Sequence, residues 1–515
     1  MTTSIDAPDR SPDATGSASP GNDRLLFGMI LGVLAFWLFA QTTLNIASTM
    51  AADVGIEMGV MNFAVSITAL FSGIFIVVVG GLADRLGRVR VVQAGFVFGI
   101  VGSLLVGLTP SGAFAPASLI AGRICQGLSA ACIMPASLAL VKAYWAGAAR
   151  QRAVSLWSMG SWGGSGFAAL FGGLVAANFG WRWIFLLGAA VSVVGMLMVR
   201  GTPESKVATS AGYRLDVRGI TTFMVAMVAL QVFVTLGGSL GWASPASLIL
   251  LAIAIIGGVI FYRVETGNPN AFVDFRLFRN LTYAGATLSN LLLNAVAGII
   301  IVAMTLVQVG GGMSAQEAGL LTLGYAIAIV MFIRVGEKLL QRFGARDPMI
   351  WGCLIVGAAI VLLLPTNLLL GTYTILAVIA FTLFGIGLGF YATPSTDAAL
   401  ANLPDDQSGA GSGLYKMASS LGASFGVAIS AAIFTALSAD QGGIGWLPGV
   451  ITFTGRQDNI ALREAATFAY GANLLMIIAA IVSIVLLVPK RRSPDRASDA
   501  AAANEGGASA PGPAS

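Results

Sequence analysis

The feature that most constrains the fold of this chain is a series of apolar segments, each about 18 or more residues long, that recur along nearly its whole length. A helix of that length spans the hydrocarbon core of a bilayer. Helices are expected because each backbone amide in lipid must be satisfied within its own segment. Only 10% of the 515 residues are charged, which is too few to cover a soluble protein of this length. The sequence therefore predicts an all-α polytopic membrane protein.

Windows of roughly 18 to 25 apolar residues predict fourteen transmembrane helices. An even number of spans places both ends of the chain on one side of the membrane. The ends, 1–24 and 491–515, contain no apolar core, and we expect disordered tails there. The spans are expected near 25–48, 61–83, 91–109, 115–140, 153–178, 183–199, 218–238, 245–263, 281–307, 316–336, 348–366, 371–394, 411–437 and 466–489.

Lysine and arginine are distributed unevenly between the two sets of loops. Loops that follow even-numbered spans hold eighteen of the 28 basic residues, whereas loops on the other face hold only Arg182, Arg456 and Arg463. Basic loops stay on the cytoplasmic side of a membrane. We therefore expect a multi-pass protein of the cytoplasmic membrane with both termini in the cytoplasm. The net charge of +5 follows from this bias and does not indicate a nucleic-acid partner.

A short basic stretch occurs twice, at matching places in the chain. "GGLADRLGR" (80–88) joins spans 2 and 3, and "LLQRFGAR" (339–346) joins spans 10 and 11. The copies share a leucine, an arginine and a glycine, and they differ where the first has Asp84 and the second has Gln341. Secondary transporters are often built from two halves related by an axis along the membrane normal. The repeat favours such an arrangement.

The first copy resembles the signature loop of the major facilitator superfamily, and "AGRICQGLSAA" (121–131) resembles the fourth-helix motif of that superfamily. Fourteen spans are typical of its drug:proton antiporter branch with fourteen helices. Within that branch, the chain is most similar to the quinolone-resistance exporters of the Nor type. The stretches that carry this resemblance are "NFAVSITALFSG" (62–73), "GLSAACIMPASLALVKAYW" (127–145), "WSMGSWGGSG" (157–166), "IRVGEKLLQ" (333–341), "YATPSTDAALAN" (391–402) and "GLYKMASSLGASFGVA" (413–428).

The resemblance implies two six-helix bundles, 25–200 and 266–490, and a transmembrane hairpin inserted in the linker 201–265. It also implies a secondary active transporter that exports amphipathic drugs, such as quinolones, biocides or dyes, by alternating access coupled to protons. The alternative is a transporter of the same fold that exports or imports an endogenous metabolite with different ion coupling. The expected partners of this monomer are a small-molecule substrate, protons and the lipid bilayer.

The first basic turn combines arginines with an aspartate and glycines. In such a fold Asp84 would cap a neighbouring helix end, while Arg85 and Arg88 would reach carboxylates or phosphates, so that the turn would latch two helices. The alternative is a positive-inside anchor without a gating role. Asp84 and the second copy favour the latch. The residues expected to form the gating loop are Gly81, Asp84, Arg85, Gly87, Arg88, Arg342 and Gly344.

Arg123 lies within a predicted span, where a guanidinium is costly and by default functional. Gln126 follows one turn later on the same face. The resemblance implies that this arginine assists proton coupling, and the alternative is snorkelling or bracing of a neighbouring helix. Many relatives carry an aspartate in span 1 where this chain has Ala40. No buried carboxylate is expected, so Asp397, just past span 12, is the best proton carrier, with a helix cap as the equal alternative.

Polar residues at helical spacing mark the expected substrate cavity. The first span of each half carries two polar amides four residues apart, although an intramembrane asparagine can also bridge helices. The glycines of span 5 allow close helix packing, but Ala168 and Ala169 replace the Gly-Pro pair that is usual in antiporters of the superfamily. The expected cavity residues are Gln41, Asn45, Ser66, Trp157, Ser161, Asn290, Asn294 and Tyr415. The expected packing residues are Gly163, Gly166, Gly172 and Gly173.

The sequence contains no pattern that indicates an enzyme. It has no GxxxxGK[ST] motif for nucleotide binding, and no nucleophile–base pair or paired carboxylates form a catalytic pattern. Histidine, the usual zinc ligand and proton relay, is absent from the sequence. We therefore expect neither a cofactor nor a metal.

Overall fold

The computed structural model describes residues 21–40, 42–206, 216–266, 268, 271, 273, 275–438, 452–455 and 457–490. Over these residues the regular structure is helical throughout, and thirteen helices are long and apolar enough to cross a membrane. The fifth expected span is not one of the thirteen. It consists of α6 (Gly147–Ser158), the π-helical turn η2 (Met159–Gly163) and α7 (Gly164–Phe179). These three elements follow one another without a gap, so the path of the chain agrees with fourteen passes.

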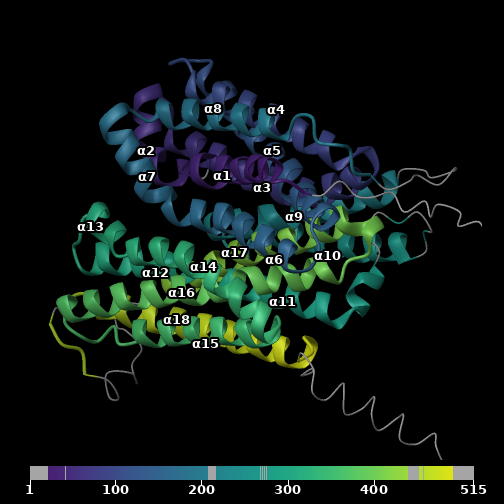
Figure 1. The fold of residues 1–515 in the computed structure, drawn as a ribbon. Coiled ribbons are helices and arrows are strands. Elements are labelled where there is room, and N and C mark those ends of the chain that lie inside the picture. Colours follow the sequence, from purple (N-terminus) through teal and green to yellow (C-terminus); the bar gives the residue numbers. More distant parts are fainter. Residues whose placement is uncertain are drawn as a thin grey trace, which may run out of the picture.

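The N-terminal bundle forms the upper half of the molecule in Figure 1. Its first pass is also divided by a π-helical turn, which widens the helix and frees a backbone carbonyl. Large side chains such as Phe96, Trp157 and Phe185 are fully buried in its core. The bundle consists of α1 (Asp23–Leu34), η1 (Ala35–Ala40), α2 (Thr43–Val54), α3 (Met58–Leu86), α4 (Arg88–Gly107), α5 (Ala115–Tyr144), α6, η2, α7 and α8 (Arg182–Val199).

The C-terminal bundle forms the lower half in the same view. Phe381, Tyr391 and Tyr470 are buried in its core. Its helices are α11 (Leu281–Ala295), α12 (Gly298–Thr305), η4 (Leu306–Gly310), α13 (Ala315–Leu320), α14 (Leu323–Phe343), α15 (Arg346–Leu363), α16 (Leu370–Ala401), α17 (Ser408–Ser438) and α18 (Ile460–Leu487). Two short 3-10 turns, η3 (Phe275–Arg279) and η5 (Asp405–Gln407), precede α11 and α17.

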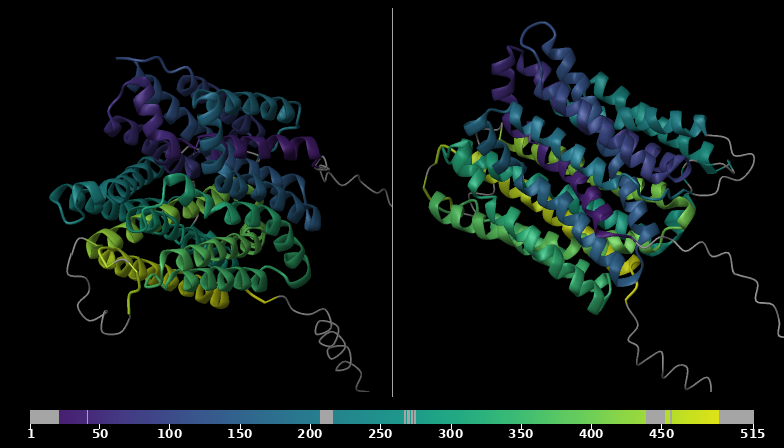
Figure 2. Two further views of the ribbon diagram at one scale, coloured as in Figure 1. Left: turned by 90° about the vertical axis from the view of Figure 1, so that its left-hand side faces the viewer. Right: turned by 45° about the horizontal axis from the view of Figure 1, so that its top comes forward.

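The inserted hairpin consists of α9 (Val217–Leu240) and α10 (Pro245–Thr266). Helix α9 packs on α3 and α17, which belong to different bundles. The hairpin therefore lies beside the interface between the bundles, where it is drawn in teal in Figure 2. Ile249, Ile255 and Ile256 of α10 are more than half exposed. Such a surface suits contact with lipid rather than with water.

One end of the bundle, which we call the basic face, holds Arg85, Arg88, Lys142 and Arg150 at the ends of α3, α4, α5 and α6. The first helix begins there, since Asp23 forms an ion pair of 3.6 Å with Arg152 of α6. The last helix ends there as well, because Arg346, at the start of α15, donates to the carbonyl of Val485 at 3.0 Å. Both ends of the helical part of the chain thus lie on one side.

The two copies of the basic turn share one backbone feature. Gly87 and Gly344 each follow the last residue of a long helix, and their φ angles are +117° and +80°. Residues that carry a side chain rarely adopt such positive φ angles, so glycine is required at both turns. A Cβ atom at Gly87 would also lie 2.5 Å from the carboxyl carbon of Glu204. The two turns therefore share a glycine with positive φ, although their ψ angles, 127° and −174°, differ.

Candidate functional site

Asp84 joins the two bundles at the basic face. Its buried carboxylate accepts hydrogen bonds of 2.9 and 2.8 Å from the amide of Gly409 and one of 3.2 Å from Ala410. These amides belong to the first turn of α17, where backbone donors lack intrahelical partners and the helix dipole favours negative charge. Arg88 donates to the same carboxylate through Nε at 2.9 Å and Nη2 at 2.8 Å. Asp84 therefore caps a helix of the opposite bundle.

The backbones of α3 and α17 approach closely beside this cap. A Cβ atom at Gly409 would lie 2.2 Å from the carbonyl oxygen of Gly80, and one at Gly413 would lie 2.7 Å from that of Ile76. Real Cβ atoms do not come so near to a backbone oxygen, so only glycine allows this contact. The close approach lets the short Asp84 side chain reach the amides of α17.

Arg88 connects the cap to two loops. Its Nη2 donates to the carbonyl of Asp405 at 2.8 Å, and its Nη1 donates to the hydroxyl of Ser205 at 3.1 Å. The carboxylate of Glu204 accepts from the amides of Val89 at 2.9 Å and Arg90 at 3.1 Å. Glu204, in the segment after α8, thus caps the start of α4. Arg88 also holds the turn before α17, which belongs to the other bundle.

Two ion pairs complete the contact between the bundles. Lys142 of α5 lies 3.0 Å from the carboxylate of Asp405, and its ammonium also donates to the carbonyl of Leu403. Arg150 of α6 donates to Asp397 of α16 at 2.9 Å. We call the basic-face lock the set made by Asp84 with α17, Arg88 with the Asp405 carbonyl, Lys142 with Asp405, and Arg150 with Asp397. Among the described residues, both ion pairs that join the bundles belong to this set.

The opposite face has an ion pair of a different kind. Asp53, at the end of α2, accepts hydrogen bonds from Arg182 and from the indole of Trp181 at 3.0 Å. All three residues belong to the N-terminal bundle. The Arg182 guanidinium and the Trp181 indole together hold the pKa of the Asp53 carboxyl below its ordinary value. This pair stabilises one bundle and does not join the two.

The expected gating residues do not all lie in the lock. Gly81 is buried within α3, and Arg85 is half-buried next to Asp84. Arg342 is exposed, and its guanidinium lies over the ring of Phe343 at 5.2 Å, on its own turn. The second copy therefore does not mirror the first, because Gln341 has no carboxylate with which to cap a helix. Lys142, Arg150 and Asp405 lie outside the expected spans, and the sequence does not reveal which distant charges pair.

Arg123 is almost completely buried in α5, where it links three passes of the N-terminal bundle. Its Nη1 donates to the Ala40 carbonyl at 2.7 Å, to the Thr43 hydroxyl at 3.0 Å and to Gln126 Oε1 at 2.8 Å. Its Nε donates to the Ala64 carbonyl at 3.3 Å. Ala40 ends the π-helical turn η1, so Arg123 is bound there by a backbone carbonyl and not by a carboxylate. Nη2 has no hydrogen-bond partner among the described residues.

The expectation that no carboxylate is buried is wrong. Asp397 lies inside α16, four residues before its last residue, Ala401. Glu337 of α14 and Glu464 of α18 are buried as well. The expected spans end before Glu337 and Asp397 and begin after Glu464, whereas the helices extend through these residues and bury them against other elements. Asp397 is not an isolated acid, because Arg150 binds it.

The expected cavity residues of the C-terminal bundle cluster tightly. The amide nitrogen of Asn290 donates to the Tyr415 carbonyl at 3.0 Å and to the Ser419 hydroxyl at 2.6 Å, and Asn294 donates to Asn290 Oδ1 at 2.9 Å. The Tyr415 hydroxyl lies 2.9 Å from that of Ser395. These side chains therefore bridge α11, α16 and α17, as intramembrane polar residues commonly do.

The expected cavity residues of the N-terminal bundle are more scattered. Trp157 of α6 is fully buried and donates from Nε1 to the Ser137 hydroxyl at 2.9 Å. Ser161 is buried in η2, and Ser66 of α3 is half-buried. Gln41 lies outside the described residues, and Asn45 belongs to α2, where its side chain is not described.

The sequence suggests no site role for Lys416, although it falls inside the expected span 411–437, and the structure places it in α17, buried at 6% exposure. Its ammonium lies over the ring of Trp157, 4.4 Å from the centroid, and 5.5 Å from the centroid of Tyr415. It thus lies between two predicted cavity residues that come from different bundles. A basic residue inside a hydropathy window was the signal that could have identified it.

Three of the four expected packing glycines have close neighbours. Cβ atoms at Gly163 and Gly166 would lie 2.7 Å from Val330 and 3.1 Å from Ala326, both in α14 of the other bundle, and one at Gly172 would lie 2.0 Å from Thr42. Gly173 differs, because a Cβ atom there would meet nothing within 4 Å. It lies on the side of α7 that faces away from these neighbours.

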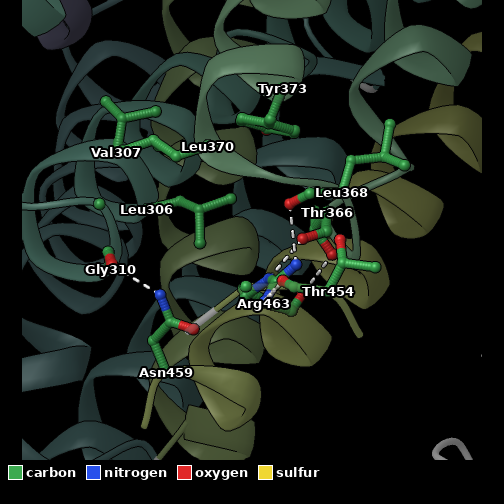
Figure 3. A pocket seen from close by; sticks show the side chains of 12 residues that line it. Leu306, Val307, Gly310, Thr366, Leu368, Leu370, Tyr373, Thr454, Asn459 and Arg463 are labelled. Carbon is green, nitrogen blue, oxygen red and sulfur yellow. Dashed lines mark hydrogen bonds between the residues drawn. The ribbon is translucent and has the colours of Figure 1, made fainter. Parts of the chain in front are cut away.

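A pocket opens within the C-terminal bundle, close to the start of α18 (Figure 3). Arg463 lies at its centre and donates to the carbonyls of Thr366 at 2.5 Å, Thr454 at 2.9 Å and Leu368 at 2.9 Å. Asn459 donates to the carbonyl of Gly310 at 2.6 Å. Arg463 and Asn459 thus hold neighbouring backbone segments together. The pocket therefore lies at a stabilised junction within one bundle and not between the two bundles.

Comparisons with known proteins agree with this architecture. A family model described as Major Facilitator Superfamily matches residues 25–426 and again 284–511. The quinolone resistance protein NorB of Staphylococcus aureus (strain MRSA252) is 44% identical over 475 residues, which are 92% of this chain and 97% of that protein. NorB of strain bovine RF122 / ET3-1 is 45% identical over 478 residues, with the same coverage.

Solved structures show the same fold at low sequence identity. The proton:xylose symporter XylE, bound to 6-bromo-6-deoxy-D-glucose, has a TM-score of 0.61 at 15% identity, over 91% of this chain and 96% of that one. The human organic anion transporter MFSD10 has a TM-score of 0.57 at 16% identity, over 90% of this chain and 100% of that one. At such identities the likeness concerns the fold alone.

Proposed function

Because the chain belongs to the major facilitator superfamily, we propose that it exports amphipathic drugs of the quinolone class across the cytoplasmic membrane in exchange for protons. The observation that carries this proposal is the identity of 44–45% with quinolone resistance proteins over 92% of the chain. The chain would be a monomeric secondary transporter and not an enzyme. Its energy would come from the proton gradient.

We assign the basic face to the cytoplasm, because basic loops stay there. Both termini would then be cytoplasmic, since the first and last helices begin and end at that face. The basic-face lock would close the cytoplasmic side of the path between the bundles. In this state the path would open to the outside. Transport would require the lock to separate while the opposite face closes, which is alternating access.

Proton coupling can act through the lock itself. Arg150 and Asp397 are held together by opposite charge. Protonation of Asp397 would remove its charge and weaken its hold on Arg150. The lock would then open more readily toward the cytoplasm, while Arg123 and Gln126 would adjust the packing of the first, second and fourth passes. In this scheme the proton is carried at the gate, since a carbonyl and not a carboxylate faces Arg123 at Ala40.

Transport in inverted membrane vesicles tests this proposal. Vesicles that contain the protein should accumulate norfloxacin when a proton gradient is imposed, and a protonophore should abolish the uptake. Vesicles with the Asp84→Asn variant are the matched control for passive binding of the drug. Uptake that does not respond to the gradient would reject proton-coupled drug export.

A metabolite transporter is the second candidate, and Ala168 and Ala169 favour it, because they replace the Gly-Pro pair that is usual in antiporters. The same vesicles distinguish the two functions. The second candidate is correct if the gradient changes the uptake of neither norfloxacin nor ethidium, while a metabolite extract competes with norfloxacin for binding to the purified protein.

A further inference from the structure

We propose that Lys416, together with Trp157 and Tyr415, forms a binding site between the bundles for the carboxylate of an aromatic, zwitterionic substrate. This inference rests on the proposed export of drugs and specifies which chemical group of the drug the protein recognises. It also assigns a role to a buried cation that the basic-face lock does not use.

The position of Lys416 suits contact with a substrate. The residue lies about two turns from the start of α17, or about 12 Å along the helix axis. It is therefore deeper than the basic-face lock, whose cap engages Gly409 and Ala410 at the beginning of the same helix. Trp157, over which its ammonium lies, belongs to α6 of the other bundle. A ligand at this place would contact both bundles.

Lys416 has no anionic partner among the described residues. Three carboxylates at the basic face are already paired with other cations: Asp84 with Arg88, Asp397 with Arg150, and Asp405 with Lys142. The Lys416 ammonium donates no hydrogen bond to any residue that the structure describes, and its contacts are two aromatic faces. An ammonium has three donors. A buried cation without an anion is costly, so a bound carboxylate would complete the site.

The two aromatic rings are fixed in place by their own hydrogen bonds. Trp157 is held through Ser137 at 2.9 Å. Tyr415 is held through Ser395 at 2.9 Å and Thr396 at 3.2 Å. Both rings are buried in this state, so a flat ring that carries a carboxylate would reach them only when the two bundles separate. It could then stack on a ring while its carboxylate takes the charge of the ammonium. A quinolone drug is such a molecule, and its amine makes it a zwitterion at neutral pH.

A pair of ligands tests this inference on the purified full-length protein in detergent. Norfloxacin and its ethyl ester share the ring system and the amine, but only the acid has a carboxylate. We expect the wild-type protein to bind the acid at least tenfold more tightly than the ester, as measured by isothermal titration calorimetry. Lys416→Gln should weaken binding of the acid at least tenfold and leave the ester unchanged. Lys416→Arg should retain part of the preference, because it keeps the charge.

The comparison on the wild type needs no variant, so misfolding of a variant cannot obscure it. Equal affinities of the wild type for acid and ester would overturn the carboxylate site and leave drug export standing. An equal loss for both ligands in Lys416→Gln would overturn it too, since Lys416 would then only brace Trp157. If the wild type binds neither ligand and norfloxacin uptake ignores the gradient, the proposed function fails, and the inference fails with it.

Discussion

Asp84 is the residue whose chemistry most directly links the two bundles. One carboxylate binds the amides of Gly409 and Ala410, in the first turn of α17, and the guanidinium of Arg88. Hydrogen bonds to a charged acceptor contribute more than neutral ones. Asparagine keeps the size of the side chain but removes its charge, and it can present only one oxygen to these donors.

We therefore expect Asp84→Asn to reduce the rate of norfloxacin transport at least tenfold while the amount of protein in the membrane stays within twofold. The matched control is Asp53→Asn, which breaks an ion pair within one bundle at the opposite face. That pair is partly exposed, and such pairs contribute about 0–1 kcal/mol, so the control should transport normally. Equal losses of transport and protein in Asp84→Asn would show a merely architectural role.

Arg123 differs from Asp84, because every acceptor that it reaches is neutral. Its planar guanidinium contacts Ala40, Thr43, Ala64 and Gln126 at once, which the single ammonium of a lysine cannot do. Both Arg123→Ala and Arg123→Lys should lower transport at least tenfold while the protein remains in the membrane. Quantitative immunoblots beside the uptake assay check this. Normal uptake in Arg123→Lys would mean that charge alone matters, and normal uptake in Arg123→Ala would reduce the residue to a brace.

At the scale of elements, the contact of α3 with α17 depends on glycine. Replacement of glycine by alanine in a helix normally stabilises it by about 1 kcal/mol. At Gly409 the new methyl would collide with the Gly80 carbonyl, so Gly409→Ala should lower the melting temperature of the purified protein and weaken the lock. Gly73→Ala on α3 is the matched control, because its methyl meets nothing within 4 Å. A melting temperature of Gly409→Ala at or above that of the control would contradict the close contact.

The ion pair between α6 and α16 can be tested by exchange of its charges. Arg150→Asp or Asp397→Arg alone places like charges together and should open the basic face, which raises the labelling rate of a cysteine introduced at the buried position Leu403. The double variant restores opposite charges and should return the labelling rate toward the wild-type value. Rates that add independently in the double variant would show that the two residues are not coupled.

The sequence predicts the existence of the helices well and the positions of their ends poorly. The apolar windows located the passes, because span length follows from the thickness of the bilayer. They ended too early at 394 and began too late at 411, whereas α16 continues to Ala401 and α17 begins at Ser408. The extra turns of α16 carry Asp397, and the extra turn of α17 carries the amides that bind Asp84. Their burial depends on the other bundle, and hydropathy along one segment contains no information about that.

At the scale of the whole molecule, the basic turn at 80–88 predicted where a lock would be but not its composition. Asp84 and the Gly409 amide are 325 residues apart in sequence, and Arg150 and Asp397 are 247 apart. A single sequence does not show which distant residues meet. The role of Lys416 is hidden from the sequence for the same reason, because its environment is made by Trp157 of the other bundle. Gln41 and the side chain of Asn45 are not among the parts of the chain that the structure describes.

The central claim is that two bundles move about a shared path and that the basic-face lock closes its cytoplasmic end. Distances between spin labels measured by double electron–electron resonance test it most directly, in a variant without the three native cysteines. One pair would join Leu86 and Asp406 at the basic face, and the other would join Phe179 and Leu320 at the opposite face, all exposed positions. Lowering the pH in the presence of norfloxacin should lengthen the first distance and shorten the second. Two distances that stay fixed, or that change in the same direction, would contradict the account.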